Sequence, residues 1–203
     1  LWGFSMGGAG AWHLGLHYPD QWSSVGAGAG FAETVKYVNL PEPVTPLTAK
    51  LLRIYDATEY ALNAANLPVI GYGGELDKQL AAAQTMQARA AEVGVTIPVL
   101  IGPQTAHKFH PDSEREFFAF HAAAAEQGRT PLLNRRKVRF TTATPKYHSC
   151  AWVVIEQQGL PYEPSVVEAE VQDDDTLTVT TKNVGVLGLT RDIAATVRLD
   201  GEE

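Results

Sequence analysis

The first part of the chain alternates short apolar runs with longer stretches of helical periodicity. Buried strands are expected at 22–30, 67–72 and 97–101, and helices at 6–18, 51–65, 78–93 and 111–127. Proline and glycine residues support the predicted ends of two helices. Pro19 follows the first helix, Pro111 begins the last helix and Gly128 follows that helix. Such alternation predicts an α/β fold, with a mainly parallel sheet and helices on its faces.

Beyond residue 130 the pattern changes to a period of two, with many Thr and Val residues and few helix signals. Strands are expected at 137–142, 151–156, 166–172, 177–181 and 193–199. Turn signals separate them at 159–161, 173–175 and 182–183. The chain is therefore predicted to hold an α/β domain at 1–128 and a small antiparallel β domain at 131–203, with a β-sandwich as one arrangement of it.

Composition narrows the classes of function. The 203 residues carry a formal net charge of −7, which argues against a nucleic-acid partner, because phosphate binding needs clustered Lys and Arg. No apolar run reaches the length of a membrane span. The single cysteine, Cys150, allows no internal disulfide and is expected to be a small buried side chain.

The run Gly3-Phe4-Ser5-Met6-Gly7 has the form G-x-S-x-G, which is typical of a nucleophilic serine on a sharp turn between a strand and a helix. Ser5 is then expected in a strained backbone conformation, with Gly3 and Gly7 at points where side chains would collide. Gly7 and Gly8 together would let another strand or the substrate approach. The backbone N–H of Met6, at the start of the helix, is the expected donor of an oxyanion hole.

A serine nucleophile needs a base, and the base needs an acid that orients it. Asp77 follows the strand predicted at 67–72, and His107 follows the strand predicted at 97–101. The carboxyl ends of parallel strands meet at one edge of a sheet, so Ser5, Asp77 and His107 are expected to be neighbours. Glu75 is the rival acid and His110 the rival base. Asp77 could also serve as a helix N-cap.

Other candidate motifs are weaker. His13 and His17 lack the glutamate of the zinc motif H-E-x-x-H and are expected to pack or to face solvent. Residues 107, 110 and 112 form a His/His/Asp group whose spacing is unspecific for a metal. The repeat at 26–30 fails the dinucleotide pattern G-x-G-x-x-G and is interpreted as a strand and turn. No metal or organic cofactor is implied.

Residues 1 to about 128 resemble the α/β-hydrolase superfamily, and within it the prolyl-oligopeptidase-like and the feruloyl- or acetylxylan-esterase-like serine hydrolases. The resemblance rests on the stretches GFSMGGAGAWHLGLHYPDQW, VIGYGGELDKQ and IGPQTAHKFHPDS. It implies Ser5 as nucleophile, Asp77 as acid and His107 as base. It also implies that residues 1–128 are the C-terminal half of such a domain, entered at the nucleophile turn, without the first strands and the loop that supplies the second oxyanion donor.

The resemblance leaves the substrate class open. An ester, small or attached to a polysaccharide, is favoured over a peptide, because the chain carries no propeller of the kind found in prolyl oligopeptidases. The alternatives are a peptidase of that family and a non-catalytic module that binds carbohydrate or a partner. Family members of this type imply export to the periplasm or the medium, and a segment lacking the first strands is expected to be weakly active or inactive.

Overall fold

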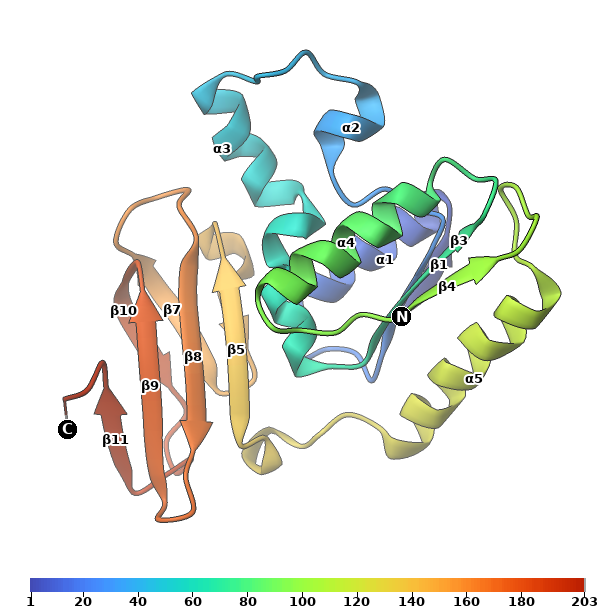
Figure 1. The fold of residues 1–203 in the computed structure, drawn as a ribbon. Helices are drawn as coiled ribbons and strands as arrows, with labels where there is room; N and C mark the ends of the chain where they lie inside the picture. Colours follow the sequence, from blue (N-terminus) through green and yellow to red (C-terminus); the bar gives the residue numbers. More distant parts are fainter. Residues whose placement is uncertain (203) are drawn as a thin grey trace. The chain divides into compact units, whose positions relative to one another are not determined.

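A computed structural model describes residues 1–202 (Figure 1). The chain divides into two compact units, Leu1–Arg129 and Thr130–Glu203. Each unit has its own sheets and its own buried core, and each is described by itself below.

The first unit is built on a four-stranded parallel sheet with the strand order β1-β2-β3-β4. The strands are β1 Trp2–Phe4, β2 Val25–Gly28, β3 Val69–Gly74 and β4 Val99–Gly102. All three pairings are parallel, so the carboxyl ends of the four strands lie at the same edge. The predicted α/β fold with a mainly parallel sheet is confirmed.

Helices cover both faces of this sheet (Figure 1). The helices of the unit are α1 Met6–His17, α2 Thr34–Val38, α3 Pro46–Tyr55, the 3-10 helix η1 Ala57–Asn66, α4 Leu80–Glu92 and α5 Pro111–Gln127, of which α1, α4 and α5 contact the strands. Successive residues of a strand point to opposite faces of the sheet. A Cβ on Gly71 would contact Trp12 of α1 and Ala83 of α4, whereas a Cβ on Gly26 would contact Phe117 of α5. Helices α1 and α4 therefore pack on one face and α5 on the other.

One predicted helix is corrected by the structure. The helix expected at 51–65 is two elements, α3 and η1, which meet at Asp56 in an extended conformation (φ −63°, ψ 122°). The Asp56 carboxylate is buried and accepts hydrogen bonds from the backbone N–H and the hydroxyl of Thr34, at 3.0 and 2.5 Å. This long-range contact favours a break that the local sequence pattern does not signal.

The second unit is a β-sandwich. One sheet has the order β10-β7-β6 and the other the order β11-β9-β8-β5. The strands are β5 Lys137–Thr142, β6 Ser149–Cys150, β7 Val153–Gln158, β8 Ser165–Val171, β9 Thr176–Lys182, β10 Val184–Leu189 and β11 Thr196–Leu199. Side chains of both sheets, among them Phe140, Trp152 and Val179, form one buried cluster. Cys150 lies in this cluster, as expected.

Several details of this unit differ from the prediction, among them the short strand β6 and the start of β11 at Thr196 rather than at 193. The strand expected at 151–156 begins at Val153, because Ala151 has a positive φ of 52° in the turn after β6. Strand β10 was not expected. Strand β11 pairs parallel to β9, so the unit is not purely antiparallel.

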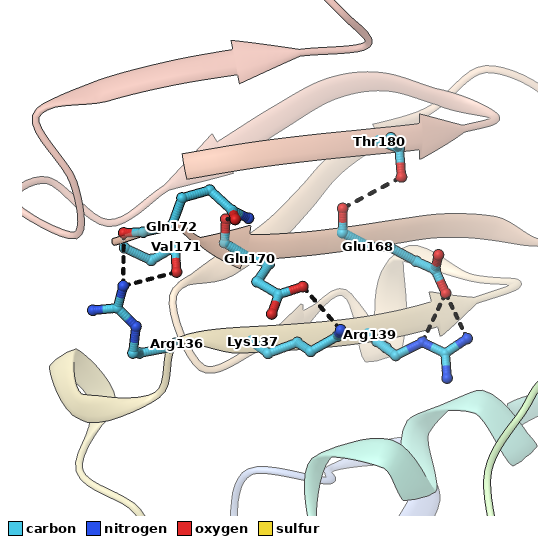
Figure 2. A network of polar contacts seen from close by, with 8 residues as sticks. All are labelled: Arg136, Lys137, Arg139, Glu168, Glu170, Val171, Gln172 and Thr180. Carbon is cyan, nitrogen blue, oxygen red and sulfur yellow. Dashed lines mark hydrogen bonds and ion pairs between the residues drawn. The ribbon is translucent and has the colours of Figure 1, made fainter. Parts of the chain in front are cut away.

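The solvent face of the larger sheet carries paired charges (Figure 2). Lys137 contacts Glu170 at 2.9 Å and Arg139 contacts Glu168 at 2.7 Å, and each pair stands directly opposite on β5 and β8. Exposed pairs of this kind contribute roughly 0–1 kcal/mol each. The buried cluster, rather than this charged face, accounts for most of the stability of the sandwich.

Across residues 1–202, none of the helices has the length and apolar character needed to cross a lipid bilayer.

Burial of His121 makes the stability of the first unit sensitive to acid. The imidazole on α5 bonds the buried Ser24 hydroxyl at 2.8 Å, and its burial lowers the pKa of His121 to about 4. The unfolded chain takes up this proton near pH 6.5, whereas the folded chain does not. Stability is therefore fully retained above about pH 6.5 and falls as the pH drops towards 4.

Lowering the pH from 7 to 5 should reduce the free energy of unfolding of the parent chain. In the variant His121→Gln this reduction is expected to be about 1–2 kcal/mol smaller. Urea unfolding of the first unit at both pH values measures this difference. A substitution in the second unit, His148→Gln, serves as the control and should leave it unchanged. An equal pH dependence in parent and His121→Gln would contradict the assignment.

Candidate active site

Ser5 lies on the turn between β1 and α1, in an unusual backbone conformation. Its φ of 57° and ψ of −119° place a side chain where glycine is normally found, at a cost of about 1–3 kcal/mol. Two backbone hydrogen bonds hold the turn, from Ser5 N–H to the Gly28 carbonyl at 2.8 Å and from Ala9 N–H to the Ser5 carbonyl at 3.0 Å. The strained conformation expected for Ser5 is confirmed.

The glycines around Ser5 have different roles. A Cβ on Gly3 would lie 2.1 Å from the Gly7 carbonyl oxygen, and one on Gly8 would lie 2.2 Å from that of Gly28. Both positions exclude any larger residue, and Gly8 lets β2 approach α1. The expectation for Gly7 is wrong, because a Cβ there would meet nothing within 4 Å. The backbone of Gly7 is what Gly3 contacts.

Asp77 stands in the turn that follows β3 and is 8% exposed. Its Oδ1 accepts a hydrogen bond from the backbone N–H of Gln79 at 3.0 Å, just before α4 begins. Its Oδ2 lies 2.6 Å from Nδ1 of His107. The carboxylate thus orders the start of α4 with one oxygen and contacts the imidazole with the other.

His107 lies in the loop between β4 and α5, and joins Asp77 to Ser5. Its Nε2 is 2.9 Å from the Ser5 hydroxyl oxygen, and its ring packs 5.0 Å from that of Phe4. A carboxylate only accepts hydrogen bonds, so Nδ1 carries the proton and donates it to Asp77. Nε2 is then free to accept from the hydroxyl. The structure brings Ser5, His107 and Asp77 together, although 102 positions separate the first two.

The loop that carries His107 is tied to the core by Tyr72 of β3. The buried hydroxyl of Tyr72 donates to the Lys108 carbonyl at 2.8 Å and accepts from the His110 N–H at 2.8 Å. Burial raises the pKa of Tyr72, so the hydroxyl keeps the proton that it donates. The Tyr72 side chain therefore fixes the backbone of both Lys108 and His110, which follow His107 in the loop. Tyr72 was not among the residues predicted from the sequence.

The rival residues are engaged elsewhere. Glu75 accepts from the backbone and side-chain N–H groups of Gln104, at 2.7 and 3.0 Å. The His110 ring accepts from the Asp112 N–H and caps α5. His17 is fully buried and bonds the carbonyl oxygens of His13 and Ile54, which is a packing role.

Met6 is the first residue of α1, so its backbone N–H has no acceptor within the helix and points from the positive end of the helix dipole. Met6 directly follows Ser5 in the sequence, so this N–H belongs to the residue next to the one that carries the hydroxyl. The arrangement suits an anionic oxygen next to Ser5.

Within residues 1–202, no three His, Cys, Asp or Glu side chains gather in an arrangement suited to a metal ion. Residues 107, 110 and 112 thus form no such cluster.

Known proteins that resemble this chain match it over the first unit. The family described as "Putative esterase" matches residues 1–113, more than half of the chain. No curated protein matches. Similar solved structures include TT1662 from Thermus thermophilus (20% identity, TM-score 0.48, covering 62% of this chain and 54% of that one). A ferulic acid esterase follows (16%, TM-score 0.45, 61% and 49%), as does an acylaminoacyl peptidase from Pyrococcus horikoshii (14%, TM-score 0.49, 64% and 24%).

The chain thus spans about half the length of TT1662 and of the ferulic acid esterase. The parallel sheet, the turn at Ser5 and the family match agree with the resemblance stated from the sequence. The chain therefore belongs to the family described as "Putative esterase".

Proposed function

We propose that this chain is a serine hydrolase that cleaves an ester by acyl transfer, with Ser5 as nucleophile, His107 as general base and Asp77 as the acid that orients it. The observation that carries the proposal is the continuous line of contacts from the Ser5 hydroxyl through His107 to Asp77, at 2.9 and 2.6 Å. A buried carboxylate, a partly exposed imidazole and a hydroxyl in this order are the parts that acyl transfer needs.

In the first step the Ser5 oxygen attacks the ester carbonyl carbon while Nε2 of His107 takes the hydroxyl proton. The carbonyl oxygen becomes an anion, which the N–H of Met6 stabilises. The tetrahedral carbon then releases the alcohol oxygen, to which His107 returns the proton. The product of this step is an acyl group on Ser5 and a free alcohol.

In the second step water replaces the alcohol. His107 takes a proton from water, the hydroxide oxygen attacks the acyl carbon, and the Ser5 oxygen leaves with the proton from His107. Asp77 stays ionised throughout and stabilises the imidazolium that forms twice in the cycle. Its second oxygen is bonded to Gln79 N–H, which keeps the carboxylate from rotating away.

An ester is the preferred substrate because the chain belongs to the esterase family. The alternative of a peptide substrate rests on likeness to the peptidase branch of the superfamily, and no side-chain contact described above favours it.

Replacement of the nucleophile gives the most direct test. Ser5→Ala is expected to abolish covalent labelling by a fluorophosphonate probe and hydrolysis of 4-nitrophenyl acetate, since within residues 1–202 no other hydroxyl contacts His107. Labelling is followed by mass spectrometry of the intact chain, with Ser23→Ala as the control. Labelling that persists at full extent in Ser5→Ala would rule out Ser5 as nucleophile.

The acid is tested by a pair of substitutions two positions apart. Asp77→Asn should lower kcat about 10³–10⁴-fold, because an amide does not hold the imidazole in the required tautomer. Glu75→Gln, which removes the rival carboxylate, should change kcat less than threefold. The reverse order of effects would transfer the role to Glu75.

Tyr72→Phe is expected to lower kcat about ten- to hundredfold by loosening the loop of His107, while KM changes little. The downfield proton signal of His107 Nδ1–H should broaden or disappear in the NMR spectrum. Tyr60→Phe is the matched control, because it removes a buried hydroxyl that donates to Ile54. A Tyr72→Phe variant with unchanged kcat and an unchanged proton signal would show that Tyr72 only supports the fold.

A further inference from the structure

A cavity of about 270 Å³ lies between the segment around α2 and the beginning of α4. Its lining comes from both elements and from the loops before them, and includes Phe31, Glu33, Tyr37, Lys78, Ala81 and Ala82. None of the three proposed catalytic side chains is part of this lining. A volume of this size admits a single substituted ring rather than a long chain.

The lining of the cavity contacts or includes the chain neighbours of two proposed catalytic residues. The hydroxyl of Tyr37 contacts the sulfur of Met6 at 3.8 Å, and Met6 directly follows Ser5. On the other side Lys78 directly follows Asp77. Chain neighbours of Ser5 and Asp77 thus contact or line the cavity, although the cavity is outside the line of contacts from Ser5 through His107 to Asp77.

The walls differ in character. The rings of Phe31 and Tyr37 stack on each other, with centroids 4.0 Å apart and planes 12° apart. The α4 side contributes the small side chains of Ala81 and Ala82. An aromatic wall facing small residues suits a flat ring, which gains contact with both sides.

The helix that carries Tyr37, α2, is anchored at its first residue by hydrogen bonds to a buried carboxylate. Thr34 opens α2 and is bonded to the buried carboxylate of Asp56 through both its N–H and its hydroxyl. The wall is therefore preorganised for a ligand, which reduces the entropy lost on binding.

The charges of the cavity favour an anion. The carboxylate of Glu33 lies 2.5 Å from the ammonium group of Lys36, although its Oε1 is buried and makes no hydrogen bond within residues 1–202. Lys78, by contrast, has no carboxylate within 4 Å among the residues that the structure describes. Asn39 and Gln79 add amide groups that can donate hydrogen bonds. One unpaired ammonium and two amides beside an aromatic wall match a ring that carries a carboxylate.

We propose that this cavity binds an aromatic carboxylate, with the ring against Phe31 and Tyr37 and the carboxylate at Lys78. As a substrate subsite, which rests on the proposed function, the cavity would select esters in which one half is an aromatic ring with an ionised carboxyl group. Binding itself does not require Ser5 to be the nucleophile.

Binding is tested with three compounds of similar size: benzoate, benzamide and benzylammonium. Their Kd values are measured by NMR titration at low ionic strength, with the parent chain and with Ser5→Ala. Benzoate is expected to bind about fivefold more tightly than benzamide, as one partly exposed ion pair allows. Lys78→Gln should remove this difference, whereas Lys182→Gln, which deletes a charge in the second unit, should keep it. Tyr37→Ala should weaken all three compounds.

A competition experiment separates this inference from the proposed function. Benzoate should inhibit hydrolysis of 4-nitrophenyl acetate competitively, with an inhibition constant equal to its Kd. Binding that depends on Lys78 without inhibition would keep the site but contradict its role as a substrate subsite.

Two results would overturn the inference. Equal Kd values for benzoate and benzamide in the parent chain would show that Lys78 recognises no carboxylate. Tightest binding of benzylammonium would assign recognition to Glu33 instead and reverse the charge of the ligand.

Discussion

The hydrogen bond from Ser5 N–H to the Gly28 carbonyl, at 2.8 Å, is the contact on which the site depends. It holds a serine in a left-handed conformation that the residue would not adopt in a free peptide. The bond forms only because Gly8 lets α1 come within van der Waals distance of β2. Close packing between the first helix and the second strand is therefore what directs the hydroxyl towards His107.

Asp77 and His107 are likewise positioned by hydrogen bonds that also stabilise the fold. Asp77 orders the start of α4 with one oxygen and meets His107 with the other. Tyr72 reaches from the middle of the sheet to the loop on either side of Phe109. Each of these groups takes part in the fold and in the site at once, so the geometry of the site follows from the stability of the parallel sheet.

The sequence predicted most of this arrangement, because a parallel sheet converts the order of strands into proximity at one edge. The proposed site residues Ser5, Asp77 and His107 were found in this way. Contacts between distant segments away from this edge of the sheet were not predictable. The break at Asp56 depends on Thr34, and β10 carries Gly185 and Gly188, which weaken the strand signal. The cavity beside the site was missed for the same reason, since its walls come from two separate segments.

Helix α2 has no buried residue and is attached mainly through Thr34 and through contacts of its exposed aromatic side chain. Its sequence is thus released from the packing demands that constrain α1 and β2. Over evolutionary time such a segment can vary in length and composition without loss of the core. Substitutions in α2 can therefore alter the lining of the adjacent cavity while the strand ends and the contacts of Ser5 with His107 stay the same.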